Sequence, residues 1–324
     1  MRVSVIIPIY NVSLFIERCA KSLMSQTLDE VEYIFVNDAT PDNSMELLSG
    51  VIACYPARVA QVRIVEHAQN KGLPAARNTG LAMATGEYVY HCDSDDYIEP
   101  EMLELLYNEA KEKEADYVWC DWFLSYDNRE RYMPQPSYTS PDDALKGMLN
   151  GAMKYNVWNK LVKRSLYVEN DILFPAGHGM GEDMTMIRLV SCATSVAYVP
   201  KALYHYVRSN TEAMTQVYNE RHMADVRYNV DETIAFIESE GVCSDVDIAL
   251  FKLNVKLPLL VTDDWTSYRR WNKWFPEANK YISHQRSFPL RTRLLQHLAV
   301  ARCYPFVWIY YQVVYRFLYS ILYK

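Results

Sequence analysis

The sequence lacks the features that define several common classes of protein. Its seven cysteines are an odd number and form no CxxC pair, which argues against a disulfide framework or a zinc site and favours a reducing compartment. No Walker A motif, internal repeat or low-complexity tract occurs. The apolar run in "MRVSVIIPIYNV" is too short for a signal peptide and has no small-residue cleavage site. We therefore expect a cytoplasmic protein.

Acidic residues are absent after Glu277, whereas seven Lys and Arg residues follow it. The first 277 residues carry 26 basic and 40 acidic residues, so an acidic body is joined to a basic tail that needs a partner. In the tail, residues 289–324, tyrosines recur at every fourth position from Tyr311 to Tyr323. Arginines beside amphipathic aromatic residues are typical of a helix in a membrane interface. One alternative is that the tail helix packs on the body or on a dimer partner. Another is a helix that spans the membrane, but Arg316 near its middle would be costly there.

The first 121 residues alternate between β-like and helix-like segments. Strands are predicted at 3–10, 33–38, 62–67, 87–93 and 116–121, and helices at 14–25, 43–54, 74–84 and 100–114. This alternation predicts an α/β fold with a mostly parallel sheet flanked by helices. Further on, short strands are expected at 196–200 and 202–207, and the polar, proline-rich residues 127–141 are expected to form a loop.

Polar residues follow three of the predicted strands. Asn11 follows the first, Asp38 closes the second and Asp93 closes the fourth. In an open α/β sheet, ligands bind outside the carboxyl ends of the strands. The sequence therefore predicts a site at this edge of the sheet.

The stretch "HCDSDDY" places three aspartates within four positions, where their charges disfavour joint ionisation. One interpretation is a DxD loop in which one or two carboxylates hold Mg²⁺ or Mn²⁺ and leave positions for phosphate oxygens. The other is that Asp95 and Asp96 cap the next helix.

Taken in order, "VSVIIPIYN", "FVNDATPDNS" and "NKGLPAARNTGLAMATGEYVYHCDSDDYIEP" resemble the family 2 inverting glycosyltransferases of bacterial cell-surface glycans, which have a GT-A fold. The resemblance covers nearly all of the first 100 residues. It continues more weakly through "NVWNKLVKRSLYVENDILFP" and "GEDMTMIRLV" to about residue 216. It implies a Rossmann-like GT-A sheet with a C-terminal helical extension.

The resemblance also implies which residues bind the donor nucleotide. The main chain around Pro8 to Tyr10 and the carboxylate of Asp38 would hold the base, by analogy uracil, and Arg77 would help bind the nucleotide. The chain departs from the family at residues 37–40, where "NDAT" replaces the usual "DDGS". This departure leaves the identity of the base open.

For the metal, Mn²⁺ or Mg²⁺, the resemblance implies that Asp95 is a ligand and that Asp93 contacts the ribose or the metal's surroundings. His205 in "LYHYVR" is a candidate third ligand, because imidazole is acceptable to Mn²⁺. The alternative is that His205 simply packs between its neighbouring tyrosines.

In "GEDM", the resemblance makes Asp183 the catalytic base, with Glu182 beside it. One carboxylate can deprotonate the acceptor hydroxyl as it attacks the opposite face of the sugar. A cap of the following helix is the alternative role for Asp183. Trp158, Asn159 and Lys160 resemble residues that line the acceptor side.

We expect four regions: a nucleotide-sugar-binding half at 1–121, an acceptor-binding and catalytic half of the same domain at 122–216, a helical extension at 217–288 and the tail at 289–324. The prediction is a metal-dependent inverting glycosyltransferase that uses a UDP-sugar and acts on a hydroxyl of a glycan, lipid-linked in view of the tail. It would be peripheral on the inner face of the plasma membrane, with the tail on anionic lipid, and no nucleic-acid partner is expected. The alternatives are a sugar-nucleotide-binding protein that has lost catalysis and a sugar nucleotidyltransferase.

Overall fold

The computed structural model describes residues 1–208, 210 and 220–318 and divides into two compact units. One unit comprises Met1–Ala144 and Tyr155–Phe236, and the other comprises Leu145–Lys154 and Ile237–Lys324. Tyr319 and Tyr323 of the predicted tail helix lie outside the described residues. Each unit is treated by itself below.

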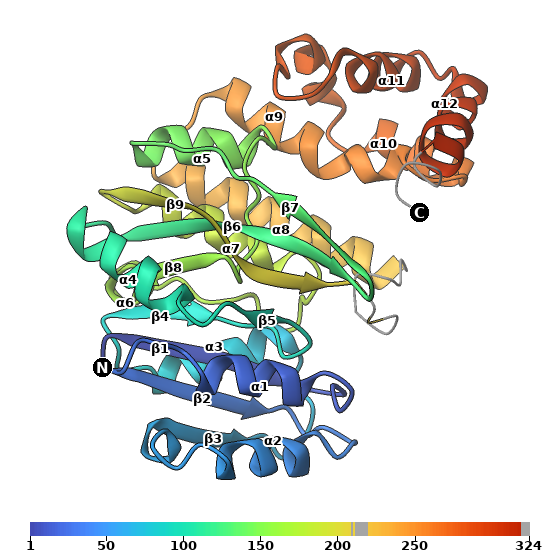
Figure 1. Ribbon diagram of the computed structural model, residues 1–324. Helices are drawn as coiled ribbons and strands as arrows, with labels where there is room; N and C mark the ends of the chain where they lie inside the picture. Colours follow the sequence, from blue (N-terminus) through green and yellow to red (C-terminus); the bar gives the residue numbers. More distant parts are fainter. Residues whose placement is uncertain (209, 211–219, 319–324) are drawn as a thin grey trace. The chain divides into compact units, whose positions relative to one another are not determined.

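In the first unit, nine strands of the described chain form one mixed sheet (Figure 1). Its order is β3-β2-β1-β4-β8-β6-β9-β5, and β7 pairs with β6. The strands are β1 (Val3–Ile9), β2 (Val31–Asn37), β3 (Val62–Glu66), β4 (Tyr88–His91), β5 (Tyr97–Ile98), β6 (Tyr117–Tyr126), β7 (Arg129–Met133), β8 (Lys160–Lys163) and β9 (Val196–Val207). The α/β GT-A type of fold expected from the sequence is confirmed.

Strands β1 to β4 run parallel, as predicted, and β1 is fully buried because helices cover both faces of the sheet. Helix α3 (Leu73–Met83) approaches β1 so closely that a Cβ on Gly80 would lie 2.3 Å from Cγ2 of Ile6. Only glycine fits at that contact. The close packing fixes the side chains of α3 relative to the carboxyl ends of the strands.

Four differences from the predicted strands concern the other half of the sheet. The two-residue strand β5, which pairs with β9, was not predicted. Strand β8 was not predicted; it lies between β4 and β6 and is antiparallel to both. The predicted loop at 127–141 instead contains β7, which forms a hairpin with β6. The two short strands predicted near residue 200 are one strand, β9, which pairs with β6 through a register shift at Asp121. Such a bulge permits a long strand to bend without ending.

The remaining helices include the three others predicted within the first 121 residues, now at 16–24, 44–53 and 102–112. Those before residue 240 are α1 (Ile16–Met24), α2 (Ser44–Ala53), α4 (Met102–Glu112), α5 (Pro141–Leu149), α6 (Arg164–Glu169), α7 (Thr185–Ser191) and α8 (Glu220–Ser239). Residues of α1, α2 and α4 share one apolar core with β1, β2 and β6.

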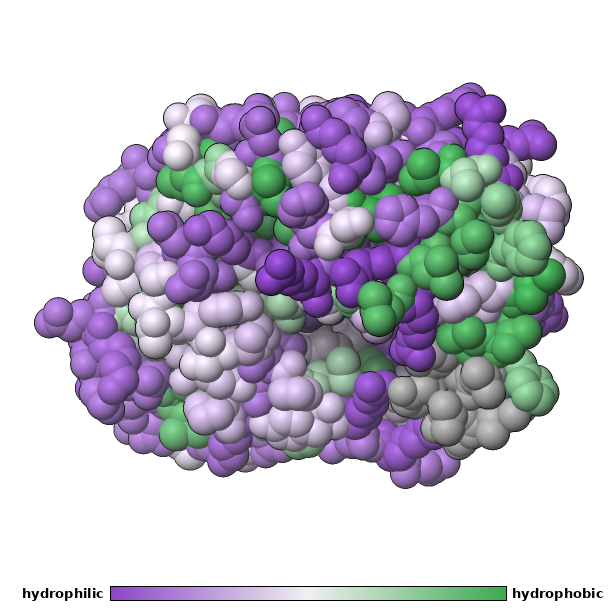
Figure 2. Space-filling view, turned by 90° about the horizontal axis from the view of Figure 1, so that it is seen from above, coloured by the Kyte–Doolittle hydropathy of each residue, from purple (hydrophilic) through white to green (hydrophobic). Residues whose placement is uncertain are grey.

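The second unit is helical. Its helices are α9 (Asp245–Lys256), α10 (Trp265–Lys273), α11 (Leu290–Val300) and α12 (Tyr304–Tyr310), followed by a π-helix, η6 (Tyr311–Leu318). Helices α11, α12 and η6 expose many large apolar side chains, and Figure 2 shows apolar surface gathered on one side of the view. Within the described ranges, no helix has both the length and the apolar character needed to cross a bilayer.

Candidate active site

Asp38 lies just beyond β2 and is almost fully buried. Its carboxylate accepts hydrogen bonds from the backbone N–H groups of Lys71 and Gly72, both at 2.8 Å, and contacts Nδ1 of His67 at 2.6 Å. Most of its acceptor capacity is therefore used to hold the loop that leads into α3. Beside it, Tyr10 is half exposed at the end of β1. Pro8 is buried within β1 and pairs with Val36.

The loop at residues 37–40 takes its shape despite the missing glycine. Ala39 adopts φ 54°, in the left-handed region where glycine is usual, as does Asn11 at φ 55°. The backbone N–H of Asn11 donates to Oγ1 of Thr40 at 2.8 Å, and that hydroxyl donates to Asp42 at 2.7 Å. These contacts join the loops after β1 and β2, so the alanine is held in a strained conformation by its surroundings.

Arg77 on α3 is the buried cation of the site, with 1% of its surface exposed. Its Nη2 lies 2.8 Å from Oδ1 of Asp93 and 3.7 Å from Oε1 of Glu182, and its guanidinium lies over the ring of Phe174. Burial by itself would lower the pKa of Arg77, but the charges of Asp93, Glu182 and Asp183 raise it overall. Its Nε and Nη1 have no hydrogen-bond partner among the described residues, so two donors remain for an anionic ligand.

The three aspartates after β4 point to different partners. Asp93 pairs with Arg77, and Asp95 accepts a hydrogen bond from Nδ2 of Asn210 at 2.7 Å. Asp96 is buried and accepts from the hydroxyl of Tyr204 at 2.5 Å and from the backbone N–H of Val207 at 2.7 Å, both on β9. Asp96 is therefore a structural link between the DxD loop and β9.

Asp93 and Asp95 offer carboxylate oxygens, which are the ligands that Mg²⁺ and Mn²⁺ prefer. Burial and the nearby charge of Asp93 raise the pKa of Asp95, so a cation at this point would relieve a real electrostatic cost. Within the described part of the chain, no group of three or more His, Cys, Asp or Glu side chains could hold a metal by itself. Mg²⁺ is commonly bound by only one or two carboxylates together with substrate phosphates and water.

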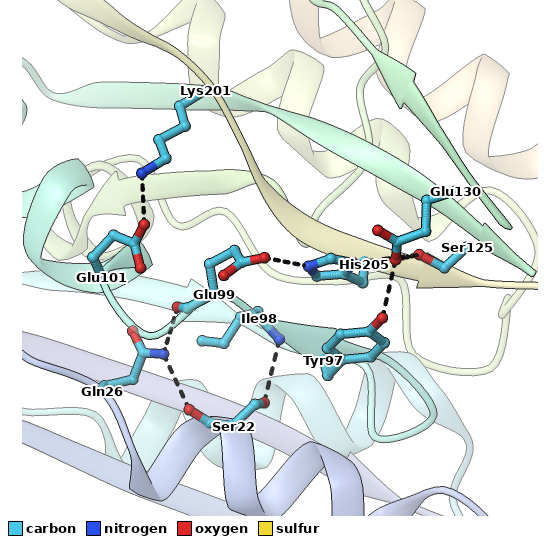
Figure 3. A network of polar contacts seen from close by, with 10 residues as sticks. All are labelled: Ser22, Gln26, Tyr97, Ile98, Glu99, Glu101, Ser125, Glu130, Lys201 and His205. Atoms are coloured by element: carbon cyan, nitrogen blue, oxygen red, sulfur yellow. Dashed lines mark hydrogen bonds and ion pairs between the residues drawn. The ribbon is translucent and has the colours of Figure 1, made fainter.

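His205 does not serve as the predicted third ligand in this structure. Its Nε2 contacts Glu99 at 2.8 Å and its Nδ1 contacts Glu130 at 2.7 Å (Figure 3). The ring is also stacked between Tyr97 and Phe123, with centroids 4.1 and 4.9 Å away. Because both nitrogens are engaged by carboxylates, neither is available to a metal beside Asp95. The packed histidine is the better description.

Asp183 and Glu182 form a short 3₁₀ turn, η2 (Glu182–Met184), before α7. Burial raises the pKa of both carboxyl groups, and Arg77 opposes this effect in both. The charge of Asp93 raises both further, and the charge of Asp183 also raises the pKa of Glu182. Neither η2 nor α7 has a side-chain cap, and the N-cap residue of α7 is Met184. Capping therefore does not explain Asp183.

Trp158, Asn159 and Lys160 are buried rather than exposed to an acceptor. The ring of Trp158 stacks on Tyr204 at 4.3 Å, and Nζ of Lys160 donates to Oδ1 of Asn159 at 2.6 Å. Burial lowers the pKa of Lys160 to about 7, and the charge of Lys160 in turn lowers that of Asp183. All three are therefore packed into the interior near Asp183, and their expected role on the acceptor side stays a prediction.

Two residues of the site were missed from the sequence. His67 bridges Asp38 and Oγ1 of Thr79, and Phe174 lies beside Arg77. The rule that polar residues gather at strand ends could have found His67, because it follows β3 directly. Phe174 lies in an irregular segment and carries no comparable signal.

Comparisons with known proteins found similar sequences and similar folds. The model of the glycosyl transferase family 2 matches residues 4–184. The glycosyltransferase EpsJ of Bacillus subtilis is 32% identical over 81% of this chain and 77% of its own length. The structure of S. aureus TarS in complex with UDP-GlcNAc superposes with a TM-score of 0.67 at 22% identity, covering 96% of this chain and 92% of the TarS chain. A mannosyltransferase from Pyrobaculum calidifontis, in complex with GDP-Man and Mn²⁺, has a TM-score of 0.51 at 16% identity over 92% and 87% of the two chains.

The family match defines a sugar-transferring enzyme, and the structural likeness defines a fold of the GT-A type. The chain belongs to glycosyltransferase family 2. The family and the enzyme class predicted from the sequence are confirmed.

Proposed function

We propose that this protein is a metal-dependent, inverting glycosyltransferase that moves a sugar from a UDP-sugar to a hydroxyl of a lipid-linked glycan. The observation that carries the proposal is the convergence of Arg77 and Asp93 with Glu182 and Asp183, which are about 90 residues further along the chain. A buried cation with unused donors beside desolvated carboxylates suits a reaction that separates charge between a sugar and a diphosphate.

The donor side supports a nucleoside diphosphate sugar. Asp95, with Asp93, would hold Mn²⁺ or Mg²⁺, which when bound stabilises the negative charge of the leaving diphosphate. The unused donors of Arg77 can reach toward the same anionic groups. The loops ordered by Asp38, with Pro8 and Tyr10 nearby, are proposed to hold the base. Uracil is preferred because TarS was solved with UDP-GlcNAc, whereas the mannosyltransferase with GDP-Man keeps guanine as the competitor.

Asp183 is proposed as the general base. A carboxylate whose pKa is raised by burial is a stronger base than an ordinary aspartate, so it accepts the acceptor's hydroxyl proton more readily. The hydroxyl oxygen then attacks the sugar from the face opposite the diphosphate, the bond to the diphosphate breaks, and the anomeric centre inverts. The charge of Lys160 lowers the pKa of Asp183, and the ionised Asp183 in turn raises the pKa of Glu182, which keeps Glu182 protonated beside it.

The lipid-linked character of the acceptor is proposed from the second unit. Exposed apolar side chains and arginines on α11, α12 and η6, without any acidic residue, suit an anionic membrane surface. An enzyme held at the inner face of the plasma membrane would meet a glycan that is carried on lipid.

Calorimetric titration of UDP, with Mn²⁺ and then with chelator, tests the donor site. We expect binding that needs Mn²⁺ and weakens at least tenfold in Asp95→Asn, because the metal links this carboxylate to the diphosphate. Asp171→Asn is the matched control: Asp171 is exposed and has φ 50°, a conformation that asparagine also adopts.

Three results would contradict the proposal in different ways. If UDP bound as tightly with chelator as with Mn²⁺, and as tightly to Asp95→Asn as to the unmodified protein, the metal would have no part in donor binding. Binding of GDP in place of UDP would overturn the assignment of uracil. Absence of both would indicate a protein that has lost the donor site.

A further inference from the structure

The expected acceptor residues are buried, so the acceptor's own sugar needs another surface. A groove of about 550 Å³ lies in the first unit, within the range of about 300–1,000 Å³ that small-molecule sites occupy. It is lined by Arg18 of α1, Tyr97 of β5, the turn of the β6–β7 hairpin at residues 125–130, and Val207 of β9.

One wall of the groove is rigid before any ligand arrives. The hydroxyl of Tyr97 at 3.0 Å, Oγ of Ser125 at 2.7 Å and Nδ1 of His205 at 2.7 Å all contact Oε1 of Glu130 (Figure 3). Below the ring of Tyr97 lies the parallel ring of His205. The hydrogen bonds from Ser125 and His205 outweigh burial and keep the pKa of Glu130 low, so the carboxylate stays ionised as an acceptor. A wall fixed in this way loses little entropy on binding.

Two tyrosine rings and two arginines give the groove a mixed aromatic and polar lining. The guanidinium of Arg18 lies 4.5 Å from the ring centroid of Tyr97, and that of Arg129 lies 4.9 Å from the ring centroid of Tyr126. Sugars combine apolar C–H faces with many hydroxyl groups, so they suit aromatic rings surrounded by carboxylates, amides and guanidinium groups. Purely anionic ligands would meet Asp127 and Glu130 in the same groove.

The groove adjoins the DxD loop. Val207, in its lining, donates its backbone N–H to Asp96, and the charge of Arg18 acts on Asp95. Asp93 pairs on its other side with Arg77, toward the proposed nucleotide site. A ligand in the groove would therefore lie next to the loop that is proposed to hold the diphosphate, without using the residues assigned to the donor.

We propose that this groove, formed by α1, β5, the β6–β7 hairpin and β9, binds a saccharide unit of the acceptor glycan. The assignment of the ligand as acceptor rests on the glycosyltransferase function proposed above. The hairpin then acts as a specificity element, because the residues at its turn provide five consecutive lining positions from Tyr126 to Glu130.

Saturation-transfer NMR on the full chain tests the groove with a defined panel: the methyl glycosides of glucose, galactose, mannose and N-acetylglucosamine. We expect magnetisation transfer to at least one glycoside. The signal should fall by at least half in Tyr126→Ala and in Arg129→Gln, and UDP with Mn²⁺ should not displace the glycoside. Arg131→Gln is the matched control, because Arg131 lies on the same strand but not in the groove's lining. Circular dichroism melting shows that each variant is folded.

The proposal is overturned if none of the four glycosides receives magnetisation, or if the groove variants leave the signal unchanged. Displacement of the glycoside by UDP would assign the signal to the donor site, and displacement by inorganic phosphate alone would make the groove an anion site. UDP calorimetry on the same samples separates the two proposals. If UDP binds but no glycoside receives magnetisation, the groove proposal is overturned. If a glycoside receives magnetisation but UDP does not bind, the donor assignment is overturned.

Discussion

At the scale of single residues, the decisive feature is the charge around Asp183. Burial raises the pKa of Asp183 above the ordinary value of about 3.9, and the base must be deprotonated to work. Activity should therefore rise with pH through this raised pKa, and the acid limb of kcat/KM should lie above that of an ordinary aspartate. In Asp183→Asn we expect kcat to fall about 10²- to 10⁴-fold, while the Kd for UDP changes less than twofold.

Lys160→Met provides the test of sign for this pH profile. The positive charge of Lys160 lowers the pKa of Asp183, so removing it makes ionisation of Asp183 harder and the acid limb should move to higher pH. Rate measurements between pH 4 and 9 at saturating donor would show the movement. A limb that stays in place in Lys160→Met, or an Asp183→Asn enzyme that stays active, would remove Asp183 from the role of base.

Residue positions at the strand ends could be predicted from the sequence, but their individual partners could not. The rule for parallel sheets placed Asp38 and Asp93 at one edge, where they are found. That Asp96, rather than Asp95, turns inward depends on Tyr204 and Val207, more than 100 residues away. Likewise, the engagement of both nitrogens of His205 depends on Glu99 and Glu130, which no local pattern joins to it.

At the scale of elements, regular segments were predictable and short ones with polar sequences were not. Strands β1 to β4 have apolar, β-branched sequences that identify them. Strand β7, "RERYM", is mostly charged and exposed, as edge strands often are, so its composition resembles a loop. Strand β8 has only four residues, and its antiparallel place between β4 and β6 comes from tertiary pairing.

The turn between α10 and η5 (Pro276–His284) depends on one buried lysine. Nζ of Lys256, on α9, donates to the carbonyl oxygens of Trp274 at 2.9 Å and Phe275 at 3.2 Å and to Oδ1 of Asn279 at 2.6 Å. It also lies 4.0 Å from the ring centroid of Trp271. Burial lowers the pKa of Lys256 to about 7, but three acceptors and an aromatic face match the three donors of an ammonium group.

Lys256→Met should therefore destabilise the protein although it removes a buried charge. Methionine fills similar space but removes one donor from each of the three acceptors, of which the carbonyl of Phe275 still accepts from the N–H of Ala278. We expect a cost of about 2–3 kcal/mol in the free energy of unfolding. Urea denaturation, followed by tryptophan fluorescence, measures this change. Lys252→Met, on the same helix and paired with the exposed Glu277, is the control and should cost less than about 1 kcal/mol. Equal stability of Lys256→Met and the unmodified protein would show that these contacts contribute nothing net.

At the scale of the whole molecule, the uneven distribution of charge predicts how the protein meets a surface. The chain has a net charge of -7, yet no acidic residue follows Glu277. In that basic part, Leu290, Leu294, Phe306 and Phe317 are each at least 60% exposed. Exposed apolar side chains beside arginines are costly in water and favourable at an anionic lipid interface.

Co-sedimentation with liposomes tests this prediction. We expect the protein to bind vesicles that contain phosphatidylglycerol at low salt, and to bind less at high salt or on phosphatidylcholine alone, because exposed charges are screened. Phe306→Ser combined with Phe317→Ser should weaken binding at least about thirtyfold, since each inserted side chain contributes on the order of 1 kcal/mol or more. Val168→Ser, at a 63% exposed position of the first unit, is the matched control. If the double variant bound as well as the unmodified protein, or if the vesicle charge made no difference, the tail would not be the membrane-binding segment, and the lipid-linked acceptor would lose its support.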